Sequence, residues 1–166
     1  MNEGSLTCEQ ANETGLLTLY DPAGEFAGEL PVGFGFKHLA AGSDGGAALI
    51  RSYAYESEDF PGEYIYESYV TYVDSTCTPV WDYEDLKFNP FEKVQVDADG
   101  NVYAGAYSST TGRQTGVISL DPGGNLRWEC YCSPLHHKWR WSIGPDDQLF
   151  IPTADSLIAF APTGQN

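Results

Sequence analysis

The feature that most constrains the fold is a short hairpin phrase that the chain repeats. The stretch "LYDPAGEF" occupies residues 19–26. Similar sequences recur as "YVDSTCTPVW" at 72–81, "SLDPGGNLRW" at 119–128 and "AFAPTGQN" at 159–166. In each copy an apolar strand runs into a turn rich in Pro, Gly, Ser or Thr, and the first three copies continue into a second strand. A repeat spaced by about 40 to 55 residues is typical of a tandem array of one supersecondary unit.

A second phrase precedes the first in three of these units. It reads "LAAGSDGGAALIRSY" at 39–53, "VQVDADGNVYAGAY" at 94–107 and "WSIGPDDQLFIPTA" at 141–154. Each copy is a strand, an Asp/Gly turn and another strand, and Asp-Gly between alternating apolar runs is a strong hairpin signal. One unit therefore holds four antiparallel strands in about 40 to 55 residues, which is typical of one blade of a β-propeller.

The sequence thus predicts an all-β repeat protein of β-propeller type, made of four-stranded antiparallel blades, in a single domain over residues 1–166. We expect a partial blade at 16–30, complete blades at 36–82 and 91–129, and three strands of another at 138–161. About three blades form an incomplete ring, because closed propellers have four to eight. Either the chain is part of a larger protein, or several chains cover one another's exposed sheet faces.

Four residues of the repeated phrases are expected to have structural roles. An Asp before Pro-Gly can accept hydrogen bonds from its own backbone and start the turn, and Asp-Gly marks the other hairpin. A Trp on an outer strand can cover the gap to the neighbouring blade. The residues concerned are Asp99, Asp121, Trp81 and Trp128.

The stretch "DADGNVYAGAY…GVISLDPGGNLRWE" resembles the repeat of the quinoprotein-type propellers, which carry a PQQ-like repeat. This group includes pyrroloquinoline-quinone alcohol dehydrogenases and non-enzymatic outer-membrane assembly lipoproteins. The resemblance implies blades docked by the Trp of each repeat, and an extracytoplasmic location. It implies no particular activity, because the same repeat serves enzymes and scaffolds alike. The matching positions are Asp99, Gly100, Val102, Tyr103, Leu120, Asp121, Gly124 and Trp128.

Charge and hydropathy exclude several kinds of partner. The chain has 24 acidic residues against eight Lys and Arg, a net charge of −16, so it would repel nucleic acids and anionic membranes. No run of about 18 apolar residues occurs, so we expect no membrane insertion. The start, "MNEGSLTCEQANETG", has neither the basic residues nor the apolar core of a signal peptide. The sequence leaves open the disulfide state of Cys8, Cys77, Cys130 and Cys132.

The stretch "RSYAYESEDFPGEYIYESYVTYVD" at 51–74 is unusually rich in Tyr and in acidic residues. It is interpreted either as a binding surface, in which Tyr supplies contact area and the acidic loop recruits a basic partner, or as an aromatic ladder with a solvated loop. Tyr69 is expected to point away from Tyr64 and Tyr66, because strand side chains alternate. The candidate binding residues are Tyr53, Tyr55, Tyr64, Tyr66, Glu56, Glu58, Asp59 and Glu63.

A second candidate site is the stretch "ECYCSPLHHKWRW" at 129–141. Two thiolates and two imidazoles are a donor set for zinc, although their spacing differs from that of zinc fingers and ribbons. The segment can equally be a polar connection between blades. The candidate metal ligands are Cys130, Cys132, His136 and His137.

The turn "DADGN" at 97–101 resembles the start of a calcium-binding loop. Asp97, Asp99 and Asn101 would supply oxygen ligands, but the later bidentate Glu is missing, which favours a plain turn. We therefore expect no cofactor, with zinc and calcium as the ions to consider.

No catalytic motif is recognised, whether a nucleophile elbow, a zinc-protease motif or a phosphate-binding loop. The sequence therefore favours a non-enzymatic binding or assembly module that engages a protein partner or copies of itself through exposed blade faces. Two alternatives remain. The chain can be a fragment of a larger extracytoplasmic quinoprotein-type enzyme, or a carbohydrate-binding propeller module.

Overall fold

The computed structural model describes residues 14–21, 23–34, 38–57, 59–85, 88–108, 114–132, 141–144, 148–152 and 156–160. Every regular element in these ranges is a β-strand, so the all-β prediction is confirmed. The described ranges contain no helix long and apolar enough to cross a membrane. The first six strands are β1 (Thr14–Tyr20), β2 (Phe26–Phe34), β3 (Leu39–Ala41), β4 (Ala47–Glu56), β5 (Tyr64–Val73) and β6 (Pro79–Tyr83). They are followed by β7 (Phe88–Val96), β8 (Val102–Ser108), β9 (Gln114–Leu120), β10 (Leu126–Cys132), β11 (Ser142–Ile143), β12 (Leu149–Pro152) and β13 (Leu157–Phe160).

The strands pair mainly with their neighbours in the chain. Strands β3 to β6 form an antiparallel first meander, and β7 to β10 form a second one. The C-terminal sheet is β11 to β13, and β1 pairs with β2 as an N-terminal hairpin. A single parallel bridge between Gly33 and Ser52 joins this hairpin to β4. None of the described sheets closes into a barrel.

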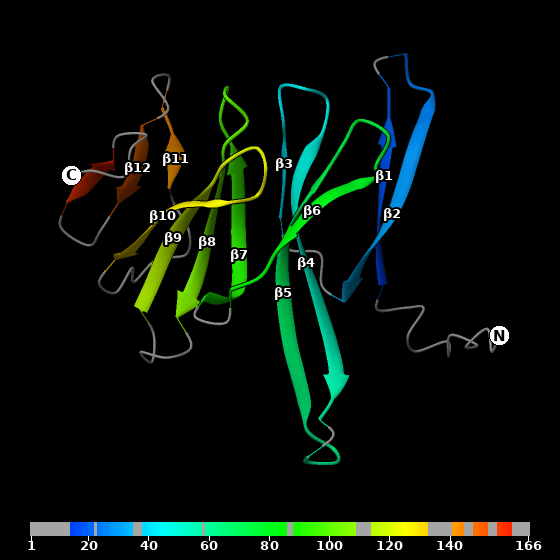
Figure 1. Ribbon diagram of the computed structural model, residues 1–166, viewed down its shortest axis with the longest axis vertical. Helices are drawn as coiled ribbons and strands as arrows, with labels where there is room; N and C mark the ends of the chain where they lie inside the picture. Colours follow the sequence, from blue (N-terminus) through cyan, green and yellow to red (C-terminus); the bar gives the residue numbers. More distant parts are fainter. Residues whose placement is uncertain are drawn as a thin grey trace.

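These four units lie side by side in chain order, from the N-terminal hairpin to the C-terminal sheet (Figure 1). An apolar cluster fills each of the three interfaces between them. Neighbouring side chains of a strand point to opposite faces, so each meander contributes to two clusters. In β4, for example, Leu49 packs against Leu17 and Val32 of the hairpin, whereas Ile50 packs in the cluster shared with the second meander.

The repeated phrase forms the same turn three times. Asp21, Asp74 and Asp121 each accept hydrogen bonds through Oδ1 from the backbone N–H groups two and four residues later, at 2.8–3.0 Å. The N–H bonds of Asn125 and Gly123, together with the Asn125 side chain, lower the pKa of Asp121. In each turn the third residue after the Asp has a positive φ. These residues are Gly24 (82°), Cys77 (65°) and Gly124 (81°).

Candidate binding surfaces

Trp81 and Trp128 each lie on the last strand of a meander. The Trp81 indole Nε1 donates a 2.9 Å hydrogen bond to the carbonyl oxygen of Pro122, in the turn that Asp121 opens. Trp128 packs on Tyr103, with ring centroids 6.0 Å apart, and borders the apolar cluster shared with the C-terminal sheet. The Trp81 bond joins consecutive meanders, whereas the contact of Trp128 with Tyr103 lies within the second meander.

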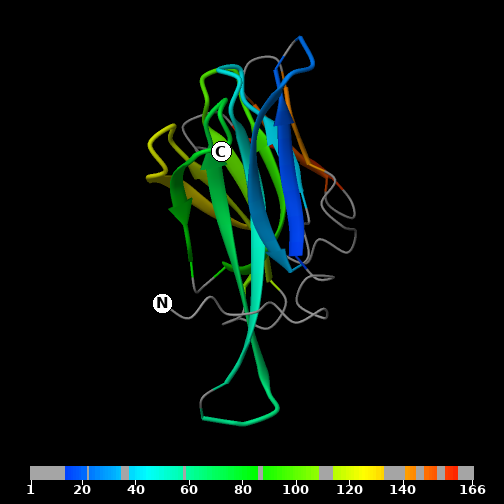
Figure 2. The ribbon, with the colours of Figure 1, turned by 90° about the vertical axis from the view of Figure 1, so that its right-hand side faces the viewer.

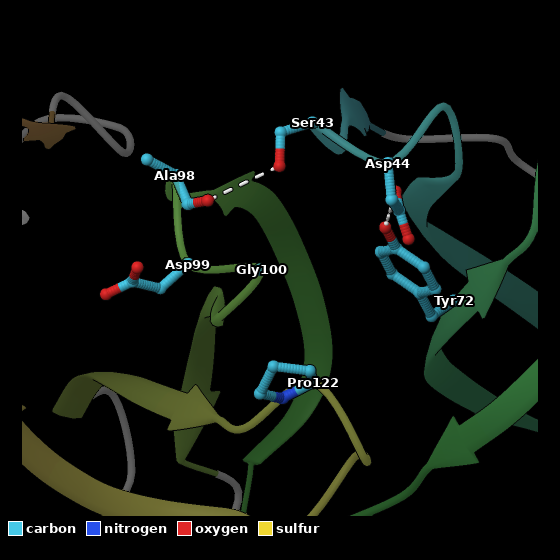
Figure 3. Close-up of a pocket in the computed structure, with 7 residues that line it drawn as sticks. All are labelled: Ser43, Asp44, Tyr72, Ala98, Asp99, Gly100 and Pro122. Atoms are coloured by element: carbon cyan, nitrogen blue, oxygen red, sulfur yellow. Dashed lines mark hydrogen bonds between the residues drawn. The ribbon is translucent and has the colours of Figure 1, made fainter.

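A cavity of about 160 Å³ lies in the seam between the two meanders (Figure 3). The Tyr72 hydroxyl donates a 2.6 Å hydrogen bond to Asp44 Oδ1, and this bond, followed by that of the Gly46 N–H, lowers the pKa of Asp44. Ser43 Oγ donates across the seam to the carbonyl oxygen of Ala98 at 3.3 Å. The residues that line the cavity are Ser43, Asp44, Tyr72, Ala98, Asp99, Gly100 and Pro122.

The two carboxylates of this cavity do not converge. The Asp99 carboxylate is directed away from Asp44, which lies on the opposite wall (Figure 3). Asp99 therefore lies at the rim of the seam, and the pair has no shared space for an ion. The arrangement is that of a hydrogen-bonded joint between sheets.

The Tyr-rich stretch forms a projecting β-hairpin. Strands β4 and β5 pair from Ala47 and Val73 as far as Glu56 and Tyr64. Strand β3 pairs only with residues 47–49 of β4, and β6 pairs only with residues 70–73 of β5. Beyond Ser52, which is bridged to Gly33 of β2, the hairpin is two-stranded and extends beyond the rest of the molecule (Figures 1 and 2). We call residues 53–67 the arm.

Several hydrogen bonds order the tip of the arm. The N–H of Ser57 donates to the carbonyl oxygen of Glu63 at 2.7 Å, and the N–H of Glu63 donates to that of Phe60 at 3.0 Å. Gly62, at φ 90°, donates its N–H to the Glu56 carboxylate at 2.7 Å. The described side chains that are exposed at the tip are Glu56, Asp59, Phe60, Pro61, Glu63 and Tyr64.

The register divides the tyrosines of the candidate binding surface between two faces of the arm. Tyr53 lies opposite Glu67, and Tyr64 lies opposite Glu56. Tyr53 and Glu56 are an odd number of positions apart, so Tyr53 and Tyr64 point to opposite faces of the arm. Tyr53 instead packs edge-on against Tyr69, with ring centroids 5.7 Å apart. Glu58 and the side chains of Tyr55 and Tyr66 lie outside the described residues.

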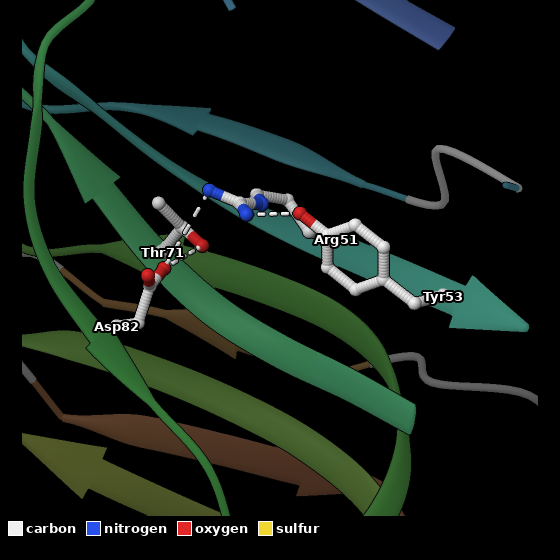
Figure 4. A network of polar contacts seen from close by, with 4 residues as sticks. All are labelled: Arg51, Tyr53, Thr71 and Asp82. Atoms are coloured by element: carbon white, nitrogen blue, oxygen red, sulfur yellow. Dashed lines mark hydrogen bonds and ion pairs between the residues drawn. The ribbon is translucent and has the colours of Figure 1, made fainter. Parts of the chain in front are cut away.

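A polar network joins three strands at the base of the arm (Figure 4). The Arg51 guanidinium on β4 donates to the Tyr53 hydroxyl, and its Nη1 lies 3.8 Å from the Asp82 carboxylate on β6. Thr71 on β5 donates its hydroxyl to the same carboxylate. Arg51 is mostly buried, so this network holds the Tyr53 ring at a defined place and stiffens the root of the arm.

Apolar side chains are exposed at both ends of the stack. On the outer face of the N-terminal hairpin, Leu16, Tyr20 and Phe26 are exposed, and the rings of Tyr20 and Phe26 pack edge-on. At the other end Leu157 of β13 is exposed, whereas its neighbour Ile158 packs inward. The outer face of the hairpin is mixed, because the register also places Thr18 and the exposed Glu29 on it.

The zinc prediction falls largely outside the described residues. Cys130 is half-buried on β10, whereas the Cys132 side chain, His136 and His137 are not described. Within the described ranges no group of three His, Cys, Asp or Glu side chains could hold a metal ion. Neither of the two described thiols, those of Cys77 and Cys130, is in a disulfide.

In the turn at 97–101 the Asp97 side chain forms hydrogen bonds with neighbouring residues of the chain. Asp97 is buried and accepts hydrogen bonds from the backbone N–H and the side-chain amide of Asn101, and from the Tyr103 hydroxyl, all at 2.8 Å. Burial and the bond to Asp97 raise the pKa of Tyr103 to about 12. These bonds are those of a plain turn, and Asp99 stands apart on the exposed side.

The sequence patterns predicted no role for two residues, the buried Cys77 and the exposed Phe60. Cys77 takes the position of Gly24 and Gly124 in the repeated turn, which an alignment of the three phrases reveals. Phe60 is exposed at the tip of the arm, and the signal was an aromatic residue directly before Pro-Gly in an acidic turn.

Comparison with known proteins finds a similar fold but indicates no activity. No protein-family model matches the chain, and no curated protein is significantly similar to it. Among solved structures, it is similar to a protein of unknown function from Bacteroides caccae, with a TM-score of 0.54 and 14% sequence identity. The match covers 92% of this chain and 56% of that one, so the chain spans about half the length of this neighbour.

Proposed function

We propose that this chain is a non-enzymatic binding and assembly module, built from propeller-type blades, that engages protein partners or copies of itself through exposed blade faces. The propeller-type arrangement is supported by two four-stranded meanders that lie face to face in chain order. The observation that carries the function is the outer face of the N-terminal hairpin, where Tyr20 is 64% and Phe26 is 61% exposed.

The physical argument compares this face with the interior ones. Each interior sheet face is covered by the next sheet, and its apolar side chains are buried in a cluster. Covering a large apolar side chain that is now exposed contributes about 1.5–3 kcal/mol. In repeat arrays the terminal units need a polar outer face for solubility, so apolar side chains exposed on an end unit favour association.

The mass of the particle in solution tests this proposal. We expect the parent chain to be a discrete oligomer by light scattering on a sizing column, and the Tyr20→Ser/Phe26→Ser variant to have a lower mass. A matched control is Phe60→Ser/Tyr64→Ser, which removes two equally exposed aromatic rings from the arm and should leave the mass unchanged. A monomeric parent chain, or equal masses for both variants, would contradict assembly through this face.

A further inference from the structure

The arm is not explained by packing of the side chains that the structure describes in it. Among the side chains that the structure describes, none between positions 53 and 67 belongs to the three apolar clusters. A two-stranded hairpin is only marginally stable by itself, so the arm depends on its continuous ladder with the meander and on the Arg51 network. Its length therefore requires another explanation.

Two aromatic rings at the end of the arm are left in solvent. Phe60 is 63% exposed and Tyr64 is 60% exposed. Aromatic side chains supply large contact areas and lose little conformational entropy when they are covered, and they are enriched among the anchors of protein interfaces. A projecting element that carries such rings fits a recess on another protein.

The charge of the arm restricts the kind of partner. From 52 to 68 the sequence contains no Lys or Arg, and the carboxylates of Glu56, Asp59 and Glu63 surround the two rings in the sequence and are exposed. Like charge opposes contact with a nucleic acid, with an anionic membrane or with the arm of a second copy. Opposite charge favours a surface that carries Lys or Arg.

The tip is also ordered before it meets any partner. The bonds of Ser57 to Glu63 and of Gly62 to Glu56 close the turn, and Ser57 Oγ accepts from the Phe60 N–H at 3.3 Å. A turn that is already closed loses less conformational entropy on binding than an open loop.

We infer that the arm is a docking element that binds a basic protein segment, with Phe60 and Tyr64 as apolar anchors and Asp59 and Glu63 as partners for Lys or Arg. This interaction is separate from the proposed assembly through the N-terminal hairpin, because the two surfaces share no residue. An experiment that rules out one of these interactions leaves the other untouched.

The first test selects ligands for the full chain from a phage-displayed library of random dodecapeptides. The expected result is enrichment of peptides that combine Lys or Arg with apolar residues, and loss of this enrichment with the Phe60→Ser/Tyr64→Ser variant. Enrichment of acidic or neutral peptides, enrichment that the variant retains, or no enrichment at all would overturn the inference.

The second test measures the Kd of one enriched peptide by calorimetry. Asp59→Asn/Glu63→Gln should weaken binding about tenfold, equivalent to about 1.4 kcal/mol. The control Glu25→Gln/Glu84→Gln changes the net charge equally at exposed positions elsewhere and should stay within about twofold. If the two double substitutions weaken peptide binding equally, the effect comes from the overall charge of the chain. The proposed role of the arm would then be overturned.

Discussion

The Trp81 ring lies directly over Gly124, so close that a Cβ on this glycine would be 2.7 Å from the ring carbon Cδ2. Gly124 also has a φ of 81°, which L side chains rarely adopt. The glycine is therefore required twice, once by the conformation of its own turn and once by the tryptophan that docks the preceding meander.

The first prediction uses a matched pair of glycines. Gly124→Ala combines backbone strain with a collision against Trp81 and should lower the free energy of unfolding by about 2–4 kcal/mol. Gly24→Ala has the same strain at φ 82°, but the space around it is open, so it should cost only about 1 kcal/mol. Urea denaturation compares the two, and equal losses would show that the contact with Trp81 is unimportant.

The second prediction separates the hydrogen bond of Trp81 from its ring. Trp81→Phe retains stacking on Tyr72 but loses the bond to Pro122, so it should destabilise the fold by about 1 kcal/mol. Trp81→Ala also removes the ring and should cost about 3 kcal/mol. If urea denaturation shows Trp81→Phe to be as stable as the parent, the indole bond contributes nothing.

The third prediction concerns pH and the pair formed by Tyr72 and Asp44. The bond from the Tyr72 hydroxyl lowers the pKa of Asp44 in the folded chain, so its stabilisation is present at neutral pH and is lost as the pH falls through that pKa. Tyr72→Phe should therefore lower the free energy of unfolding by about 1 kcal/mol at about pH 7, and by less at about pH 3.

Urea denaturation at the two pH values measures this difference, with Asp44→Asn as the control. The control has no carboxylate at this position, so a further Tyr72→Phe change should have the same effect at both pH values. A loss in Tyr72→Phe that grows with acidity would contradict the assignment.

The fourth prediction concerns the reactivity of Cys77. Its thiol is buried beneath the N-terminal hairpin, and this burial, followed by the charges of Asp74 and Glu29, raises its pKa. Iodoacetamide should therefore modify Cys77 at least about a hundredfold more slowly than the half-buried Cys130, because the raised pKa lowers the thiolate fraction and the reagent reaches the covered sulfur only when the hairpin opens. Mass mapping of the alkylated peptides measures both rates, and equal rates in the folded chain would mean that Cys77 is not covered.

The fifth prediction tests whether the fold depends on the arm tip. Residues 57–63 can be replaced by Asn-Gly, which closes a two-residue hairpin between the paired Glu56 and Tyr64. No described core side chain is removed, so the free energy of unfolding should change by no more than about 1 kcal/mol in urea denaturation. A large loss would show that the tip supports the sheet stack.

The sequence by itself determined the local structure of this protein. Asp at the start of each repeated turn, and Gly at the position of positive φ in two of the three turns, suit local needs of the backbone, so the sequence predicts these hairpins. Alternating apolar residues between the turns gave the all-β class for the same reason. An exposed, acidic loop within the Tyr-rich stretch was also predictable, because its composition suits neither a core nor a strand.

Only the tertiary structure decided which of these residues meet. Tyr53 and Tyr64 lie on opposite faces because a single step of register reverses the direction of a strand side chain. Trp81 meets Pro122 across 41 positions of the chain, and Cys77 meets β1 across 60. The exposure of Phe60, Tyr20 and Phe26 depends likewise on where neighbouring sheets end. Such contacts form between distant segments, and their energies depend on how whole sheets stack, which no local pattern encodes.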